Sequence, residues 1–379
     1  MIPNSDRQIE LPAPFPDPQL YNETLEEGFR NFPERKVNYR KYKASQRGLT
    51  LEYLPIRMDI ENVSRCNYRC AMCQVSEWPK LKRADDMSLE DYKALLESQI
   101  GLIEIKLQGM GEPLMGKCYA EMIYYARNKH IWVRSTTNGS LLHLGDNYKR
   151  VIDADICELQ VSFDGATPET YESIRMGGKF RAVARNCDLL NQYARDSGRT
   201  RTRMWVVVQK ANVHELALFP QLASELGFNR LTFSLHLNDW GQEHWRQLNQ
   251  GIDAGSKLDL SSLTTLVRLG RQHDVGVTFW AMDQKYETGD PARICPWPFA
   301  RAYVSSDMRI VPCCIVANPD VSDLGNARQL AQEWNNEKMI EFRRSHLHGP
   351  TPEMCKLCYK APLMRTNRYS GVEPAPPTV

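Results

Sequence analysis

Three cysteines lie within eight residues of one another, at Cys66, Cys70 and Cys73. Three thiolates on one short loop can hold three corners of a cubane 4Fe-4S cluster, which leaves the fourth iron without a protein ligand and open to chemistry. Tetrahedral zinc is the competing metal, but its structural sites usually pair two C-x2-C groups, and no fourth ligand lies nearby in the sequence. Three buried free cysteines are the remaining alternative.

A second group of five cysteines occupies the last quarter of the chain, at Cys295, Cys313, Cys314, Cys355 and Cys358. Around them the sequence predicts a strand, a turn at Asp307, a second strand and a helix containing Trp334. Four thiolates on such a small unit can close all four corners of a cluster, which would then carry electrons without binding substrate. Zinc would use the same C-x2-C chemistry.

Between the two cysteine groups, short apolar runs alternate with amphipathic segments of helix length. Length and β-branched content predict strands at Ile56–Asn62, Leu102–Leu107, Ile131–Thr136, Ile156–Phe163, Met204–Val208 and Leu231–Leu235. Helices are predicted at Ser88–Ser98, Tyr119–Lys129, Phe180–Asp196 and His214–Leu226. This alternation indicates βαβ units and a parallel sheet. We therefore expect an α/β fold, a partial (β/α)6 TIM-like barrel with a small C-terminal cysteine-rich α+β module.

In such a barrel the chemistry sits at the C-terminal ends of the strands. The first cysteine group follows the first predicted strand directly, and polar turns follow the next four. These turns are Gly109–Pro113, Thr136–Gly139, Ser162–Gly165, and Gln209 with Asn212. Small hydroxyl and amide side chains suit a ribose and an amino-acid carboxylate, and Arg175 is a candidate carboxylate partner. As helix caps and turn residues, the same side chains would be purely structural.

The C-x3-C-x2-C motif after a first strand resembles the signature of the radical SAM superfamily. The resemblance implies that S-adenosylmethionine binds the open iron and is cleaved reductively to a 5'-deoxyadenosyl radical, which abstracts hydrogen from a substrate. It further implies cofactor contacts by Tyr68, by Gly111 and Glu112, and by strand-end residues, namely Thr137, Asn138, Ser162, Arg175 and Gln209. An external one-electron donor such as flavodoxin or ferredoxin is the implied partner.

Given that motif, the C-terminal segment resembles the SPASM and Twitch auxiliary-cluster modules. A full SPASM module holds two clusters and needs about seven cysteines. The five cysteines here fit the shorter Twitch form. The resemblance implies a second 4Fe-4S cluster on Cys295, Cys313, Cys355 and Cys358. Cys314 is the spare thiol, although Cys313 and Cys314 could exchange roles.

The composition sets further bounds. The net charge is +2 with acidic and basic residues interspersed, which does not indicate a nucleic-acid or anionic-membrane partner. No apolar stretch is long enough to span a membrane and no signal peptide is evident, so we expect a soluble cytoplasmic protein. The predicted organisation is an N-terminal extension (1–55), the barrel (56–285), the auxiliary module (286–365) and a tail (366–379). Modest helical patterns mark 22–30 and 38–46, and 238–259 is predicted to be a loop over the barrel mouth.

These features favour an oxidoreductase or lyase acting on a small polar substrate such as a sugar, cyclitol or aminoglycoside. The auxiliary cluster would accept an electron from the substrate radical. Substrate contacts are predicted just after the sixth strand, at His236, Asn238, Asp239 and Trp240. One alternative is an enzyme that modifies a ribosomally made peptide, and the other is a non-catalytic zinc-binding protein. The 55-residue extension favours the small substrate, because a leader-binding winged-helix domain needs about 80 residues.

Overall fold

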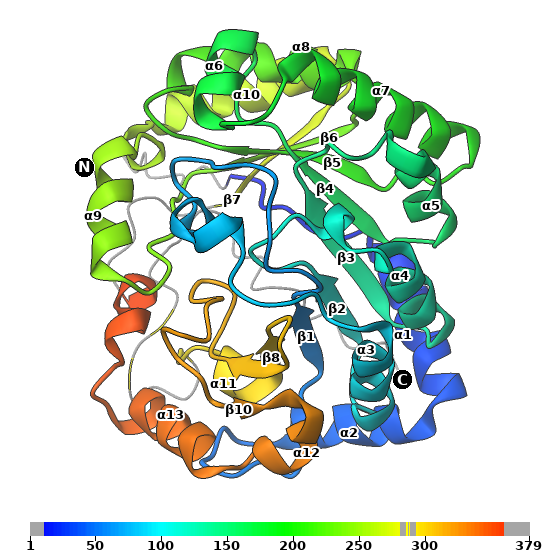
Figure 1. Cartoon of the computed structure of the whole chain (residues 1–379), viewed down its shortest axis with the longest axis vertical. Helices are drawn as coiled ribbons and strands as arrows, with labels where there is room; N and C mark the ends of the chain where they lie inside the picture. The colour runs from blue at the N-terminus through cyan, green and yellow to red at the C-terminus, as the bar shows by residue number, and fades with distance from the viewer. Residues whose placement is uncertain (1–10, 281–285, 287, 289–292, 360–379) are drawn as a thin grey trace, which may run out of the picture.

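The computed structural model describes residues 11–280, 286, 288 and 293–359. At its centre is one sheet with the strand order β10-β9-β8-β1-β2-β3-β4-β5-β6-β7 (Figure 1). The strands from β8 to β7 in this order pair in parallel. Their bounds are β1 Arg57–Ile60, β2 Glu104–Leu107, β3 Trp132–Thr137, β4 Glu158–Ser162, β5 Thr202–Val207, β6 Arg230–Ser234, β7 Gly276–Trp280 and β8 Arg301–Val304.

The predicted partial barrel is confirmed, and each of the six predicted strands is present with ends shifted by a few residues. The structure adds β7, whose buried core Val277–Phe279 is too short to stand out as an apolar run in the sequence. The strand predicted before the turn at Asp307 is present as β8. Its pairing with β1, in register from Arg57 opposite Arg301 to Ile60 opposite Val304, was not predicted. The cysteine-rich module therefore continues the barrel sheet.

The helices lie outside the curved sheet (Figure 1). Those following the strands are α3 Leu89–Ser98, α4 Tyr119–Asn128, α5 Asn147–Asp153, α6 Pro168–Ile174, α7 Phe180–Asp196, α8 Phe219–Glu225, α9 Glu243–Ile252 and α10 Leu260–Gln272. The side chains of Ser88 and Thr167 accept hydrogen bonds from the backbone N–H groups of Asp91 and Thr170, as expected of N-caps.

Asn212, one of the polar strand-end residues, donates from its side chain to the carbonyl oxygens of Asp164 and Val207, both at 2.8 Å, and does not cap the helical turn that follows it. One sequence prediction is wrong at this level. The segment predicted to be a loop over the mouth contains the helix α9, because Trp245 and Asn249 lie one turn apart and are both buried. Because most residues of this segment are polar, the sequence did not indicate that one face of it is buried.

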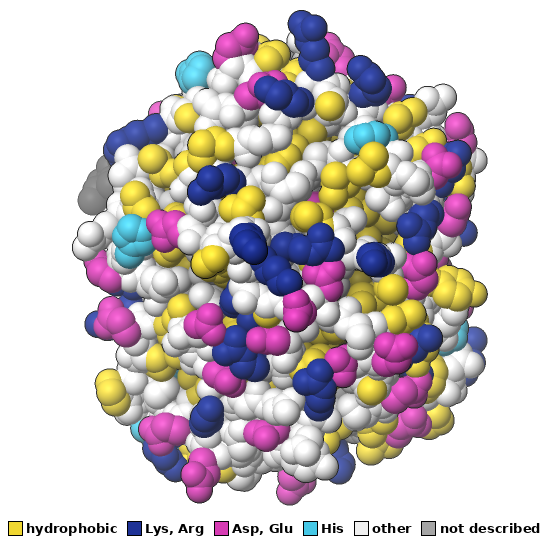
Figure 2. All heavy atoms as spheres, in the orientation of Figure 1, with side chains coloured by type: hydrophobic (Ala, Val, Ile, Leu, Met, Phe, Trp, Pro, Cys, Tyr) yellow, Lys and Arg dark blue, Asp and Glu magenta, His cyan; other side chains and the backbone are white. Residues whose placement is uncertain are grey.

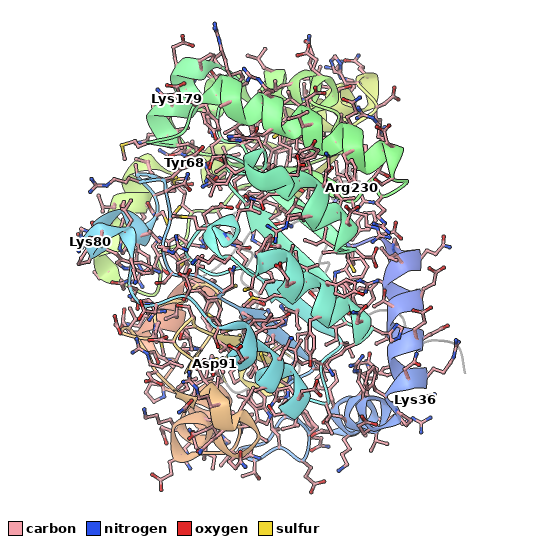
Figure 3. The ribbon with its side chains drawn as sticks, turned by 45° about the vertical axis from the view of Figure 1, so that its right-hand side comes forward. Lys36, Tyr68, Lys80, Asp91, Lys179 and Arg230 are labelled. Carbon is pink, nitrogen blue, oxygen red and sulfur yellow. The ribbon has the colours of Figure 1, made fainter. Side chains whose placement is uncertain are left out.

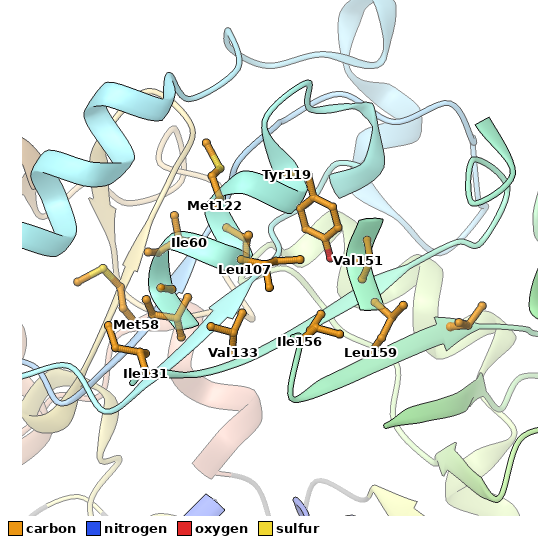
Figure 4. Close-up of a cluster of buried hydrophobic side chains, with 14 of the residues drawn as sticks. Met58, Ile60, Leu107, Tyr119, Met122, Ile131, Val133, Val151, Ile156 and Leu159 are labelled. Atoms are coloured by element: carbon orange, nitrogen blue, oxygen red, sulfur yellow. The ribbon is translucent and has the colours of Figure 1, made fainter. Parts of the chain in front are cut away.

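Each barrel strand has one apolar and one polar face. Met58, Ile60, Leu107, Val133 and Leu159 point outward and pack against helices α4 and α5, where Met122, Tyr119 and Val151 meet them (Figure 4). The alternate side chains point into the barrel and are mostly polar or charged. This arrangement places the main core between sheet and helices and leaves the barrel interior hollow.

The C-terminal module consists of α11 Trp297–Ala300, β8, the antiparallel strands β9 Arg309–Val311 and β10 Gly325–Asn326, and helices α12 Leu330–Glu333 and α13 Glu337–His348. The N-terminal helices α1 Pro18–Asn31 and α2 Pro33–Ala44 pack on the start of the barrel, where the Tyr21 and Trp132 rings are 5.0 Å apart. None of the helices in the described part of the chain is long and apolar enough to cross a membrane.

Candidate active site

The loop after β1 brings Cys66, Cys70 and Cys73 together. The backbone N–H of Cys66 donates to the carbonyl oxygen of Leu81 at 3.2 Å, and that of Cys73 donates to Cys70 at 3.0 Å, which closes the loop on itself. Burial raises the pKa of all three thiols, to about 12 for Cys73. A bound metal centre would favour the thiolate forms, because its positive charge compensates theirs. The residues fit a cluster site of this kind.

Arg175 packs against this loop. Its Nη1 lies 3.9 Å from the Cys70 sulfur and its Nη2 lies 2.6 Å from Asp164 Oδ2. Burial lowers the pKa of Arg175, but the Asp164 carboxylate more than offsets this and holds the pKa above its usual value. The guanidinium predicted to grip a cofactor carboxylate is therefore already paired inside the protein.

Glu112 lies at the end of the turn after β2. Its carboxylate accepts hydrogen bonds from Thr137 Oγ1 at 2.5 Å and from the backbone N–H of Asn138 at 2.7 Å. Burial raises the pKa of Glu112 to about 7 in spite of these bonds. A bound ammonium group would favour the ionised form, which agrees with the predicted role toward the methionine amine.

Gly111 is required by the close approach of this turn to the cysteine loop. A Cβ atom there would lie 2.4 Å from the carbonyl oxygens of both Val63 and Arg65. The neighbouring Glu112 N–H donates to the same Arg65 oxygen at 2.9 Å. The two predicted cofactor motifs are thus joined by backbone contact.

Side chains from β3 connect to the cysteine loop as well. Asn138 donates to Asn67 within the motif at 2.9 Å, and Asn67 in turn donates to Ser140 at 2.9 Å. Ser162 lines the same space, whereas Gln209 is buried behind it and does not reach the cavity wall.

Tyr68 is buried, lying against Ile174 and Leu237, while Lys80 of the same loop lies at the periphery of the molecule (Figure 3). Among the predicted substrate contacts, His236, Asn238 and Trp240 line the cavity, and the Trp240 indole N–H donates to the Met72 carbonyl at 3.0 Å. Asp239 turns away and pairs with Arg246 at 3.2 Å.

The second cysteine group gathers in the C-terminal module, whose strand β8 pairs with β1. The Cys355 thiol interacts electrostatically with Cys313, Cys295 and Cys358, whereas the Cys314 thiol interacts with Asp59 and Lys106 inside the barrel. The adjacent residues Cys313 and Cys314 therefore face different surroundings. The ligand set with Cys313, and Cys314 as the spare thiol, stays a prediction.

Two residues not predicted from sequence support this group. His346 Nε2 lies 3.9 Å from the Cys355 sulfur, and its Nδ1 lies 2.5 Å from the Tyr359 hydroxyl. Burial lowers the pKa of His346 to about 4, so the imidazole is neutral at pH 7. Nothing in the amino-acid sequence indicates this role for His346 beyond its being a histidine on a helix. Among the residues that the structure describes, no three His, Cys, Asp or Glu side chains form a site for a single metal ion.

One cavity of about 770 Å³ contains both cysteine groups on its wall. It is also lined by most of the predicted cofactor residues, by aromatic rings including Trp205 and Trp280, and by the inward-facing charged side chains of the strands. A species formed at one group can therefore meet a molecule that also lies near the other.

Comparison with known families agrees with this architecture. Residues 61–217 match the radical SAM superfamily, and residues 295–359 match SPASM, an iron-sulfur cluster-binding domain. The chain belongs to the radical SAM superfamily and carries a SPASM domain. Membership implies a 4Fe-4S cluster, S-adenosylmethionine and auxiliary iron-sulfur binding. It confirms the predicted class and cofactors.

Several proteins of this superfamily are similar to the chain. Mycofactocin maturase MftC of Mycolicibacterium smegmatis is 27% identical over 199 residues, which is 52% of this chain and 48% of MftC. GTP 3',8-cyclase of Pseudomonas fluorescens is 31% identical over 178 residues, 45% of this chain and 50% of the cyclase. The chain thus spans about half the length of these curated relatives.

Solved structures share the fold. Streptococcus suis SuiB bound to precursor peptide SuiA superposes with a TM-score of 0.61 at 14% identity, covering 84% of this chain and 72% of SuiB. The AdoMet-bound anSMEcpe gives a TM-score of 0.57 at 18% identity, covering 80% of this chain and 88% of the other.

Proposed function

We propose that this radical SAM enzyme modifies a peptide substrate. The observation that carries the proposal is the single cavity whose wall holds both cysteine groups. A substrate in that cavity can lose hydrogen at one end and exchange an electron at the other. The substrate class is supported by the relatives, since MftC is named a maturase and SuiB was solved with a precursor peptide. These names favour the peptide alternative over the sugar-like substrate that the sequence suggested.

Each group of residues has a proposed task. Cys66, Cys70 and Cys73 hold the first cluster, and Glu112 receives the ammonium of the methionine moiety. When bound, the cluster and S-adenosylmethionine supply a 5'-deoxyadenosyl radical that removes a hydrogen atom from the substrate. Cys295, Cys313, Cys355 and Cys358 would hold the auxiliary cluster, which would supply a one-electron acceptor beside the substrate.

The same tasks define the proposed organisation. Residues 1–55 extend the barrel, 56–285 form the radical domain and 286–365 carry the auxiliary site, with the remainder a tail that lies outside the described residues. His236, Asn238 and Trp240 are proposed substrate contacts because they line the cavity. Asp239 and Gln209 do not line the cavity, so we propose neither a substrate contact for Asp239 nor a cofactor contact for Gln209.

The test uses the anaerobically reconstituted full chain with S-adenosylmethionine and a flavodoxin reducing system. Synthetic peptides encoded beside the gene, and a parallel set of aminoglycosides and cyclitols, are incubated and analysed by mass spectrometry for the loss of two hydrogens. Cys70→Ala is expected to abolish 5'-deoxyadenosine formation. Cys355→Ala is expected to retain it without product. Oxidation of the small polar compounds but of no peptide would overturn the proposal.

A further inference from the structure

The inner wall of the barrel carries an excess of positive charge. Five cationic side chains and three carboxylates face the cavity from the strands, namely Arg57, Lys106, Arg134, Arg203 and Arg301 against Asp59, Glu104 and Glu158. The outer surface differs, since both signs of charge are scattered over the face in Figure 2. A cavity lined by an excess of one sign of charge favours ligands of the opposite sign.

Most of the arginines are neutralised within the wall. Glu104 pairs with Arg57 at 3.1 Å and with Arg134 at 2.9 Å, and Glu158 pairs with Arg203 at 3.3 Å. One carboxylate thus serves two guanidinium groups on neighbouring strands. This part of the wall has no spare acceptor for another cation.

Lys106 and Arg301 remain. Within the described part of the chain, neither makes a hydrogen bond or an ion pair, although Arg301 lies 5.4 Å from the centre of the Trp297 ring. Asp59 lies between their strands, opposite Lys106 in register, and is 6% exposed. It too has no hydrogen-bond or ion-pair partner among the described residues. The Asp59 carboxylate interacts electrostatically with both Lys106 and Arg301, so one carboxylate faces two cations and one positive charge is left over.

We propose that Lys106 and Arg301 bind a carboxylate of the substrate at the inner wall of the barrel. A carboxylate accepts charge-assisted hydrogen bonds from both an ammonium and a guanidinium group, and the guanidinium can bind it bidentately. The Cys314 thiol of the auxiliary module interacts electrostatically with Lys106 and Asp59, so the bound group would lie close to that module. This inference rests on the proposed function, because it takes the substrate to be a peptide that carries either an acidic side chain or a free C-terminus.

Lys106 is the decisive residue. Arg301 also interacts with the Cys295 thiol, so part of its charge serves the auxiliary site. Lys106 interacts instead with Arg134, Asp59 and Cys314, none of which is a proposed ligand. A variant of Lys106 therefore tests substrate binding without altering the cluster ligands.

The experiment measures the shift in unfolding temperature of the reconstituted enzyme with S-adenosylmethionine at fixed ionic strength. Four probes are titrated to tens of millimolar. N-acetylglutamate α-amide carries only a side-chain carboxylate, and N-acetylglutamine carries only a terminal carboxylate. The neutral N-acetylglutamine amide and inorganic phosphate complete the set. We expect at least one carboxylate probe to stabilise the enzyme and the neutral amide not to do so. The carboxylate that binds identifies its source.

Lys106→Met is expected to weaken the binding of that probe by roughly 10-fold or more, and Lys106→Arg to restore it. Lys210→Met, at an exposed lysine outside the cavity, is the matched control. The iron content and the circular dichroism spectrum of Lys106→Met, compared with those of the natural chain, show whether the variant is folded and loaded.

Equal binding of the neutral amide, binding of phosphate alone, no response to either carboxylate, or unchanged binding by Lys106→Met would each overturn this inference. The outcome is separate from that of the proposed function. A protein that binds the carboxylate but modifies no peptide would contradict only the function. A protein that modifies peptides lacking any carboxylate would contradict only this site.

Discussion

The buried ion pair between Asp164 and Arg175 offers the sharpest test of how the active-site loop is held. Asp164 follows β4 and is fully buried, and Arg175 follows α6 and is 9% exposed. The second oxygen of Asp164 accepts a hydrogen bond from the Val207 N–H at 2.7 Å. Asp164→Asn keeps an oxygen for Val207 but removes the charge opposite Arg175.

The expected loss in the free energy of unfolding follows from the burial of this ion pair. Removing one partner of a buried ion pair leaves an uncompensated charge and costs about 3–5 kcal/mol. For a chain of 379 residues the unfolding entropy is about 0.8 kcal/mol per degree, so the unfolding temperature should fall by about 4–6 °C. Arg175→Met in the Asp164→Asn background removes the orphaned charge. The double variant should therefore lose about 1–3 kcal/mol less than the two single variants summed.

The assay is anaerobic thermal unfolding of the metal-free chain, followed by circular dichroism. Asp146→Asn is a suitable control, because Asp146 pairs with Lys149 at 3.4 Å on the exposed surface and its loss should leave the midpoint unchanged. If Asp164→Asn unfolds with the same midpoint as the natural chain, or if the two single effects simply add, the reasoning is refuted.

Three further predictions address other parts of the site. Gly111→Ala should prevent the turn after β2 from meeting the cysteine loop, seen as S-adenosylmethionine affinity lowered at least tenfold by equilibrium dialysis; unchanged affinity would contradict the 2.4 Å approach. Cys313→Ser should lower the iron content from about eight to about four per chain while Cys314→Ser leaves it unchanged, and the reverse result would exchange their roles. Burial alone would raise the pKa of Asp307, but the hydrogen bond from Ser305 and the charge of Arg83 lower it to about 2. The ionised carboxylate therefore stabilises the fold above about pH 4, and this stabilisation is lost as the pH falls through about 2. Asp307→Asn should accordingly cost roughly 1–2 kcal/mol at pH 6 and nothing near pH 2, measured by urea unfolding, and a loss independent of pH would count against it.

The sequence by itself determined the class of chemistry. Cys66, Cys70 and Cys73 follow the first strand at a spacing that limits which metal centre they can hold, and this depends on only eight residues of chain. The order of strands and helices was equally local, because the alternation of apolar runs and amphipathic segments is imposed by hydrogen-bonding geometry. The predicted cofactor residues at strand ends followed from the parallel sheet, and most of them line one cavity.

Local patterns could not show which face of a strand turns inward. Arg57-Met58-Asp59-Ile60 and Glu104-Ile105-Lys106-Leu107 alternate strictly, so each offers a charged and an apolar face. Only the packing of helices against the apolar face places the charged face inside, where Lys106 has no hydrogen-bond or ion-pair partner among the described residues. The alternation of charged and apolar residues along these two strands is the sequence feature that could have predicted the charged inner wall.

The tertiary structure alone decided how the two cysteine groups are related. β8 pairs with β1 across about 240 residues of sequence, so the auxiliary module joins the barrel wall and its cysteines face the same cavity as the first group. Two further features depend on that pairing. They are the contact of His346 with Cys355 and the different surroundings of Cys313 and Cys314. Spacing along the chain fixes which ligands a short loop can offer, whereas the distance between two loops depends on hydrogen bonds and packing between segments far apart in sequence.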